Sequence, residues 1–255
     1  MVTAARTFNS EFQSAPVPLW REVLFGVDWL SLRLSPVYYG FGVPRGDGAP
    51  VIVVPGFLGS DTYLMELHNW LRRIGYQPYY SRIGRNAECP DVLTERLLET
   101  MDQARRDTGR KMHLVGHSLG GLLARSAAAR RPEQVTQVIC LASPFRDIRV
   151  HPMVLAAAGL VRRQIQQGRQ QRSRRVKRDC FTGGCSCQFV TSVQDDPPKA
   201  VRRAAIYTKT DGVVDWRSCV EPNGKLNIEV EGTHVGLAFN PQVYQRLATL
   251  LAAHR

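Results

Sequence analysis

The chain has 255 residues, of which 44% are hydrophobic and 22% are charged. These values exclude an intrinsically disordered chain and allow a large buried core, so neither a disulfide framework nor a structural metal is needed for folding. The formal net charge is +12. The excess is concentrated in one segment, because residues 148–178 contain nine Arg or Lys residues and no acidic residue.

Three interpretations of this basic segment are open: a solvated face, contact with an anionic membrane surface, or contact with nucleic acid. Nucleic acid is not expected, because the segment has no interleaved aromatic residues and no recognisable binding fold. Residues 1–12 lack the pattern of a secretory signal. No apolar stretch of the sequence is as long as a membrane-spanning helix requires. We therefore expect a cytoplasmic location, with or without peripheral contact with a membrane.

Residues 1–48 are predicted to form an N-terminal helical segment ahead of the main domain. Apolar residues recur in it at spacings of three and four, which puts them on one helical face. These residues are Leu19, Val23, Val27, Leu30 and Leu34, and the face is widened by Trp20, Leu24, Phe25 and Trp29. Two interpretations are open: the face packs on the domain, or it rests on a lipid surface.

Between residues 49 and 145, short apolar runs alternate with amphipathic segments. The runs at 51–54, 78–83, 112–115 and 135–141 are predicted strands, and the segments at 60–74, 92–106 and 119–130 are predicted helices. Further strands at 204–207 and 226–230 and a closing helix at 241–253 follow an irregular stretch, residues 146–203. Alternating strands and helices favour an α/β fold, with a parallel sheet covered on both faces.

Residues 116–120 read Gly-His-Ser-Leu-Gly, which matches the pattern G-x-S-x-G. Such a pentapeptide also occurs by chance, but here an apolar strand enters it and an Ala/Leu-rich helix leaves it, as a nucleophile elbow requires. The turn exposes the Ser118 hydroxyl above the sheet, and the helix N-terminus behind it favours developing negative charge. Ser118 is therefore predicted to be a nucleophile.

With this elbow the chain resembles the α/β-hydrolase superfamily and, within it, the bacterial lipases and esterases. The resemblance rests on the elbow and on residues 54–59, 141–145, 210–214 and 233–237, and it covers about residues 49–145 and 204–253. Many relatives have a His-Gly pair where this chain has Pro55-Gly56, and many have Gly or Thr in place of Ser143. The resemblance implies an α/β-hydrolase fold and acyl transfer from an ester through a serine.

A serine nucleophile needs a histidine base that is oriented by a carboxylate, and this fold supplies them in the order Ser, acid, His. Asp211 directly follows a predicted strand and matches the family pattern, so it is preferred to Asp215, which resembles a capping turn. His234 and His254 follow the acid. His254 is next to the last residue, where chains fray, so His234 is the predicted base.

Other acids and histidines are weaker candidates. Asp195 and Asp196 belong to the irregular stretch, and His68, His113 and His151 have no supporting context. His117 is interpreted as structural, with its side chain pointing away from the catalytic face. The oxyanion hole is expected to use the backbone N–H of Leu119 and, by resemblance, that of Phe57.

Relatives insert a cap or lid where this chain has residues 146–203, so we expect one domain, residues 49–255, with a lid-like insert. In that insert, residues 153–161 can form a short apolar helix. Cys180, Cys185 and Cys187 are spaced C-x4-C-x-C, and Cys219 follows the acid motif. This spacing suits zinc poorly, and free thiols, a disulfide and a metal all remain open.

The sequence thus predicts a serine hydrolase that cleaves small-molecule or lipid esters through an acyl-Ser118 intermediate, without a cofactor or a catalytic metal. Two alternatives remain: an acyltransferase with the same triad, and a non-catalytic protein that binds a lipid or a partner on the same scaffold. The sequence does not indicate acyl-chain length, head group, stereochemistry or oligomeric state.

Overall fold

The central element is a six-stranded parallel sheet with the strand order β3-β2-β4-β5-β7-β8. Its strands are β2 (Pro50–Val54), β3 (Gln77–Tyr80), β4 (Met112–His117), β5 (Val135–Leu141), β7 (Arg202–Tyr207) and β8 (Asn227–Glu229). The computed structural model describes residues 9–172, 179–182, 185–195, 198, 200–221 and 226–253. The predicted α/β class is confirmed.

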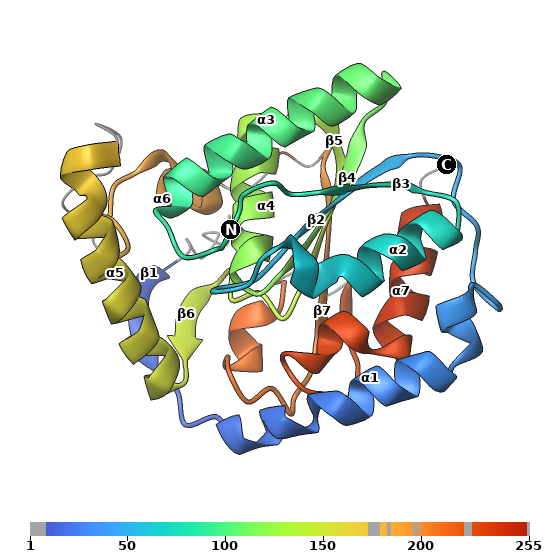
Figure 1. Ribbon diagram of the computed structural model, residues 1–255, viewed down its shortest axis with the longest axis horizontal. Helices are drawn as coiled ribbons and strands as arrows, with labels where there is room; N and C mark the ends of the chain where they lie inside the picture. Colours follow the sequence, from blue (N-terminus) through green and yellow to red (C-terminus); the bar gives the residue numbers. More distant parts are fainter. Residues whose placement is uncertain are drawn as a thin grey trace, which may run out of the picture.

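Helices cover both faces of this sheet (Figure 1). On one face lie α3 (Pro90–Thr108), α4 (Leu119–Arg130) and α6 (Gln188–Asp195), and on the other lie α1 (Phe25–Leu34), α2 (Met65–Arg73) and α7 (Pro241–Ala252). Alternate residues of one strand serve the two cores: Ile52 and Val54 pack on the first face, Val51 and Val53 on the second. This division is the two-residue period of a strand that is buried on both sides.

The predicted boundaries agree closely where the pattern was strong. The helix predicted at 119–130 and the strand predicted at 135–141 have those bounds in the structure. The strand predicted at 78–83 ends at Tyr80 instead. Ser60 precedes a short 3₁₀ helix, η3 (Asp61–Leu64), but its side chain does not cap it, because the hydroxyl pairs with that of Thr62.

The described parts of residues 146–203 contain more regular secondary structure than the sequence suggests. They contain β6 (Asp147–Val150), the 21-residue helix α5 (Pro152–Arg172) and α6. The short apolar helix expected at 153–161 is therefore only the first half of α5. β6 pairs in parallel with β1 (Asn9–Ser14) in a separate two-stranded sheet, beside α5 in Figure 1. Residues 173–178, the end of the basic segment, lie outside the described residues.

Within the N-terminal segment, residues 9–14 form β1, and a 3₁₀ helix, η1 (Leu19–Leu24), continues into α1. Its apolar face does not pack on the domain. Val23, Leu34 and Trp20 are 75%, 76% and 68% exposed, whereas the buried residues of α1 are Asp28 and Leu32. The packing interpretation of this face is therefore wrong. Among the described residues no helix has the length and apolarity to span a membrane.

Candidate active site

Ser118 stands between the end of β4 and the start of α4 with φ 52° and ψ −125°. A side chain in this left-handed region costs about 1–3 kcal/mol of strain, which the surrounding structure must offset. The flanking glycines make the turn sterically allowed. A Cβ at Gly116 would lie 2.5 Å from the backbone of Gly120, and one at Gly120 would lie 2.3 Å from the carbonyl oxygen of Val54. The backbone N–H of Ser118 donates to the carbonyl oxygen of Leu141 at 2.8 Å.

Asp211 is buried in the loop after β7, and both of its oxygens are used. Its Oδ1 accepts hydrogen bonds from the backbone N–H groups of Val213 and Val214, at 2.8 and 2.7 Å. Its Oδ2 lies 2.7 Å from Nδ1 of His234. The two backbone donors fix the carboxylate so that one oxygen remains directed at the imidazole.

Asp215, four residues on, has a different environment. Its Oδ1 accepts from the backbone N–H of Arg217 and caps the 3₁₀ helix η5 (Trp216–Cys219). The guanidinium groups of Arg149 and Arg217 lie 3.8 and 3.4 Å from its carboxylate. This is the capping turn that the sequence indicated for Asp215.

His234 is buried in the loop between β8 and the 3₁₀ helix η6 (Gly236–Phe239). Burial by itself lowers the pKa of its imidazole, but the charge of Asp211, the hydrogen bond to Asp211 and the charge of Glu22 together raise that pKa above its ordinary value. The pair is therefore electrostatically suited to hold a proton on Nδ1, which leaves Nε2 to exchange one.

His117 is closer to His234 than the sequence suggested. Its Nε2–H donates to the carbonyl oxygen of His234 at 2.9 Å, and the two rings are 4.9 Å apart. The expectation that its side chain points away from the catalytic face is wrong, because the side chain also lines the cavity beside Ser118. Burial and the neighbouring His234 lower its pKa to about 3, so it stays neutral.

Phe57 lies in a tight loop between β2 and η3 that presses against the elbow. A Cβ at Gly56 would lie 3.0 Å from the Cβ of Ser118. Leu58 has a positive φ of 62°. Within the described part of the chain, neither the N–H of Phe57 nor that of Leu119 donates a hydrogen bond to another group. Both expected oxyanion donors are thus without a partner in the described structure, and both belong to segments that adjoin Ser118.

Asn86 holds this loop in place, a role that no sequence pattern indicates. The residue is fully buried, and its Nδ2 donates to the carbonyl oxygen of Pro55 at 2.9 Å. Its backbone exchanges two further bonds with the loop, to Gly59 and from Leu58, each 2.8 Å long. Three hydrogen bonds from one residue therefore shape the backbone around Phe57.

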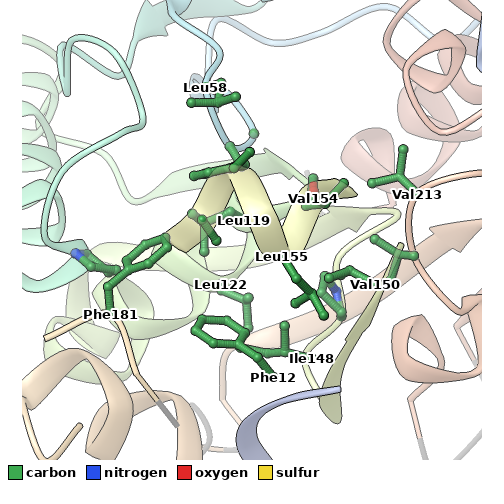
Figure 2. Close-up of a pocket in the computed structure, with 18 of the residues that line it drawn as sticks. Phe12, Leu58, Leu119, Leu122, Ile148, Val150, Val154, Leu155, Phe181 and Val213 are labelled. Atoms are coloured by element: carbon green, nitrogen blue, oxygen red, sulfur yellow. The ribbon is translucent and has the colours of Figure 1, made fainter. Parts of the chain in front are cut away.

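Ser118 opens into an apolar cavity of about 380 Å³. Figure 2 shows its walls, which come from parts of the chain far apart in sequence. The labelled side chains are Phe12 of β1, Ile148 and Val150 of β6, Val154 and Leu155 of α5, Leu119 and Leu122 of α4, and Leu58, Phe181 and Val213 from loops. A lining of this kind suits a hydrocarbon group rather than a charged one.

The structure brings together Asp211, His234, His117 and the elbow, but it does not show a hydrogen bond between Ser118 and His234. Among the described residues the Ser118 hydroxyl has no hydrogen-bond partner, so no bond joins it to His234. Such contacts often tighten only when substrate binds. The remaining candidates lie elsewhere: His68 stacks on Tyr80, and His151 accepts from the N–H of Met153 at the start of α5. Asp196 and His254 are outside the described residues.

All six cysteines are buried and none is in a disulfide. Cys180, after α5, packs in a small apolar cluster with Cys89, the residue before α3. Within the ranges that the structure describes, no group of His, Cys, Asp or Glu has the arrangement of a metal site.

A nucleophile elbow on the third strand of a parallel sheet, followed in sequence by an acid and a histidine in contact, is the arrangement of α/β hydrolases. A family model for the alpha/beta hydrolase fold matches residues 49–186, more than half of the chain. The chain therefore belongs to this family.

The chain is similar to two triacylglycerol lipases. It is 30% identical over 132 residues to that of Burkholderia plantarii, a match that covers 48% of this chain and 37% of the lipase. It is 32% identical over 106 residues to that of Pseudarthrobacter phenanthrenivorans, which covers 38% and 33%. The matches span less than half of the length of these relatives.

Solved structures share the fold at low identity. A metagenome-derived lipolytic enzyme superimposes with a TM-score of 0.56 at 17% identity, over 83% of this chain and 96% of that enzyme. A lipase from Bacillus licheniformis gives a TM-score of 0.54 at 16% identity, over 82% and 94%. These two likenesses bear on the fold alone.

Proposed function

We propose that this protein is a serine hydrolase that cleaves carboxylic esters, with Ser118 as nucleophile, His234 as general base and Asp211 as the orienting acid. The observation that carries the proposal is the contact between Asp211 Oδ2 and His234 Nδ1, 2.7 Å long, beside an elbow serine that opens into an apolar cavity. A carboxylate that is held by two backbone N–H groups fixes the tautomer of the imidazole, which is what a serine nucleophile requires.

In the proposed reaction, Nε2 of His234 takes the proton of Ser118 as the hydroxyl oxygen attacks the ester carbonyl. The negative charge that develops on the carbonyl oxygen is stabilised by the free N–H groups of Phe57 and Leu119. His234 then donates the proton to the leaving alcohol, which yields acyl-Ser118. Water repeats the sequence with His234 as base and releases the acid.

The substrate proposed is an ester with an apolar acyl group. The cavity beside Ser118 presents hydrocarbon side chains, and the first half of α5 contributes one wall. The similar proteins include triacylglycerol lipases. We therefore also propose that residues 146–203 act as a lid on one domain formed by residues 49–255, with α5 covering the acyl group.

Replacement of Ser118 tests the proposal. We expect the wild-type chain to hydrolyse p-nitrophenyl esters of graded chain length and to be labelled by a fluorophosphonate probe. Ser118→Ala should abolish labelling and lower turnover by about 10⁶-fold, the scale of losing a serine nucleophile. Full labelling of the Ser118→Ala variant would contradict the assignment.

The same assay separates the rival functions. An acyltransferase transfers the acyl group to an added alcohol in preference to water, and product analysis with glycerol or short alcohols detects the new ester. A non-catalytic binding protein hydrolyses no ester and is not labelled. Predominant release of free acid supports the hydrolase.

We further propose peripheral contact with an anionic lipid surface. The exposed face of η1 and α1 consists of bulky apolar side chains, among them Trp20 and Leu34. This pattern is typical of helices that lie in a membrane interface. The exposed Arg162 and Arg163 on α5 add positive charge near the cavity. The basic residues at 174–178 lie outside the described residues.

A further inference from the structure

The carboxylate of Glu22 lies directly behind the two loops that carry Asp211 and His234. Glu22 belongs to η1, about 190 residues away from those loops in sequence. Its Oε1 accepts hydrogen bonds from the backbone N–H of Gly212 at 2.9 Å and of His234 at 3.0 Å. Its Oε2 accepts a third bond, 2.8 Å long, from the backbone N–H of Val235. One side chain therefore joins the residue after Asp211 to His234 itself.

The sequence at Gly212 accommodates this contact. A Cβ at position 212 would lie 2.8 Å from Oε1 of Glu22 and 2.7 Å from the carbonyl oxygen of Pro18. Any other residue would push η1 away from the Asp211 loop. Gly212 thus permits the carboxylate to reach the backbone beside the acid.

On the histidine side, the backbone of two consecutive residues, His234 and Val235, is held from two directions. Glu22 accepts from the N–H groups of His234 and Val235, while their carbonyl oxygens accept from His117 Nε2–H and from the hydroxyl of Tyr63 at 2.7 Å. All four bonds lie within one residue of the imidazole. These four bonds fix the backbone that carries the His234 ring, and Glu22 accepts two of them.

The segment that carries Glu22 is itself anchored on the same loop. Asp28, one turn and a half later, accepts from the backbone N–H and hydroxyl of Thr233 at 3.2 and 3.1 Å, and from Nδ2 of Asn240 at 3.0 Å. At the far end of α1, Arg33 forms an ion pair with Glu66 of α2. Except for Leu32, the apolar side chains of α1 are exposed, so these polar contacts supply most of the attachment that holds Glu22 in place.

From this geometry we propose that Glu22 is a positioning residue for the reaction: it fixes the His234 loop against the Asp211 loop and adds its negative charge to that of Asp211 behind the imidazole. This inference depends on the proposed function for its catalytic meaning. The effect of the charge has a direction, because Glu22 contributes to raising the pKa of His234, after the larger contributions of Asp211.

Glu22→Gln tests the proposal. The amide keeps the size of the side chain but removes its charge and replaces one acceptor oxygen by an NH₂ donor, which cannot accept from a backbone N–H. We expect kcat to fall by about 10- to 100-fold, the scale of a small misplacement of a catalytic group, with little change in KM because Glu22 does not line the cavity.

The pH profile distinguishes positioning from a general loss of stability. Activity requires neutral His234, so kcat/KM falls as pH drops through the pKa of the free enzyme's imidazole. Without the negative charge of Glu22 the imidazolium is less stable, so the pKa of His234 is lower in the variant. The acid limb of kcat/KM therefore moves to lower pH in Glu22→Gln, whereas mere unfolding of part of the sample lowers the rate without moving the limb.

Glu66→Gln is the matched control. Glu66 is also a half-buried carboxylate that holds the N-terminal segment, through Arg33 and the hydroxyl of Tyr38, but it contacts neither catalytic loop. We expect this variant to lower the unfolding temperature while the acid limb stays at its wild-type position. Equal pH profiles and equal kcat for the wild type and Glu22→Gln would overturn the inference.

A second readout does not depend on ester hydrolysis. The ¹³C-labelled His234 ring, assigned with a His234→Asn variant, is titrated by NMR in the wild type and in Glu22→Gln. A titration at lower pH in the variant supports the electrostatic role, and an unchanged titration overturns it. If the wild type neither hydrolyses esters nor is labelled at Ser118, the proposed function fails, while this titration still decides the contact between Glu22 and His234.

Discussion

At the scale of single residues, two aspartates four positions apart have opposite surroundings. Asp211 receives two backbone N–H groups and directs its second oxygen at His234. Asp215 caps η5 and lies beside Arg149 and Arg217. The two carboxylates therefore have different partners although they share one loop after β7: Asp211 contacts the imidazole, and Asp215 caps a helix.

Substitution of the two aspartates is expected to give unequal results. Asp211→Asn exchanges the acceptor next to Nδ1 for an amide and favours the wrong tautomer of His234, so turnover should fall by about 10⁴-fold. Asp215→Asn retains a capping oxygen and should leave turnover within a few-fold of the wild type. Steady-state kinetics with one ester checks both, and a loss confined to Asp215→Asn would reverse the assignment.

At the scale of elements, the loop between β2 and η3 depends on a residue of a different loop. Asn86 precedes α3, yet its side chain and backbone hold Pro55, Leu58 and Gly59. A loop with a positive φ at Leu58 needs such support, because the left-handed conformation of a branched side chain is not stable by itself. The position of the Phe57 N–H follows from this clamp.

Asn86→Ala should therefore act on catalysis more than on binding. Loss of the Nδ2 bond to Pro55 lets the Phe57 N–H drift, and the loss of one oxyanion donor costs about 10²- to 10³-fold in kcat, which is the upper bound here. Asn227→Ala is the control, because Asn227 clamps the backbone of Glu221 through its amide in the same way, away from the cavity. Equal kcat for both variants would exclude a role for Asn86 in the oxyanion hole.

At the scale of the whole molecule, two surface features bear on lipid contact: the exposed apolar side chains of η1 and α1, and the exposed Arg162 and Arg163 of α5. The exposed side of η1 and α1 is almost wholly apolar, since its two carboxylates, Glu22 and Asp28, turn inward to the His234 loop. The formal net charge of +12 adds long-range attraction to an anionic surface. Both features support the proposed contact with an anionic lipid surface.

Co-sedimentation with vesicles measures this adsorption. Each Lys or Arg near an anionic surface contributes about 1 kcal/mol, and salt screens that attraction over roughly 8 to 10 Å. Binding to phosphatidylglycerol vesicles should thus exceed binding to phosphatidylcholine vesicles and weaken as salt rises. Leu30→Glu, which puts a charge on the exposed face of α1, should reduce binding to both kinds of vesicle. Absence of binding to either lipid would leave the segment as a solvated face.

Much of the fold and three residues of the candidate site could be predicted from the sequence, because their signals are local. The alternation of apolar strands with helices fixes a parallel sheet, and the spacing of small residues around Ser118 marks a strand-to-helix turn. Asp211 and His234 lie in the loops that follow β7 and β8, and the carboxyl ends of parallel strands meet at one edge of the sheet. Local periodicity and chain order therefore suffice for these elements.

Only the tertiary structure decided which surfaces are buried and which distant groups meet. The helical period of residues 19–34 is the same whether the apolar face points inward or outward, and it is the inward Asp28 and Leu32 that settle the direction. The pairing of β1 with β6 and the hydrogen bonds that Glu22 accepts join parts of the chain more than 130 residues apart. Such contacts leave no periodic pattern in the sequence. They depend on which distant segments the fold brings together and not on the neighbouring residues in the chain.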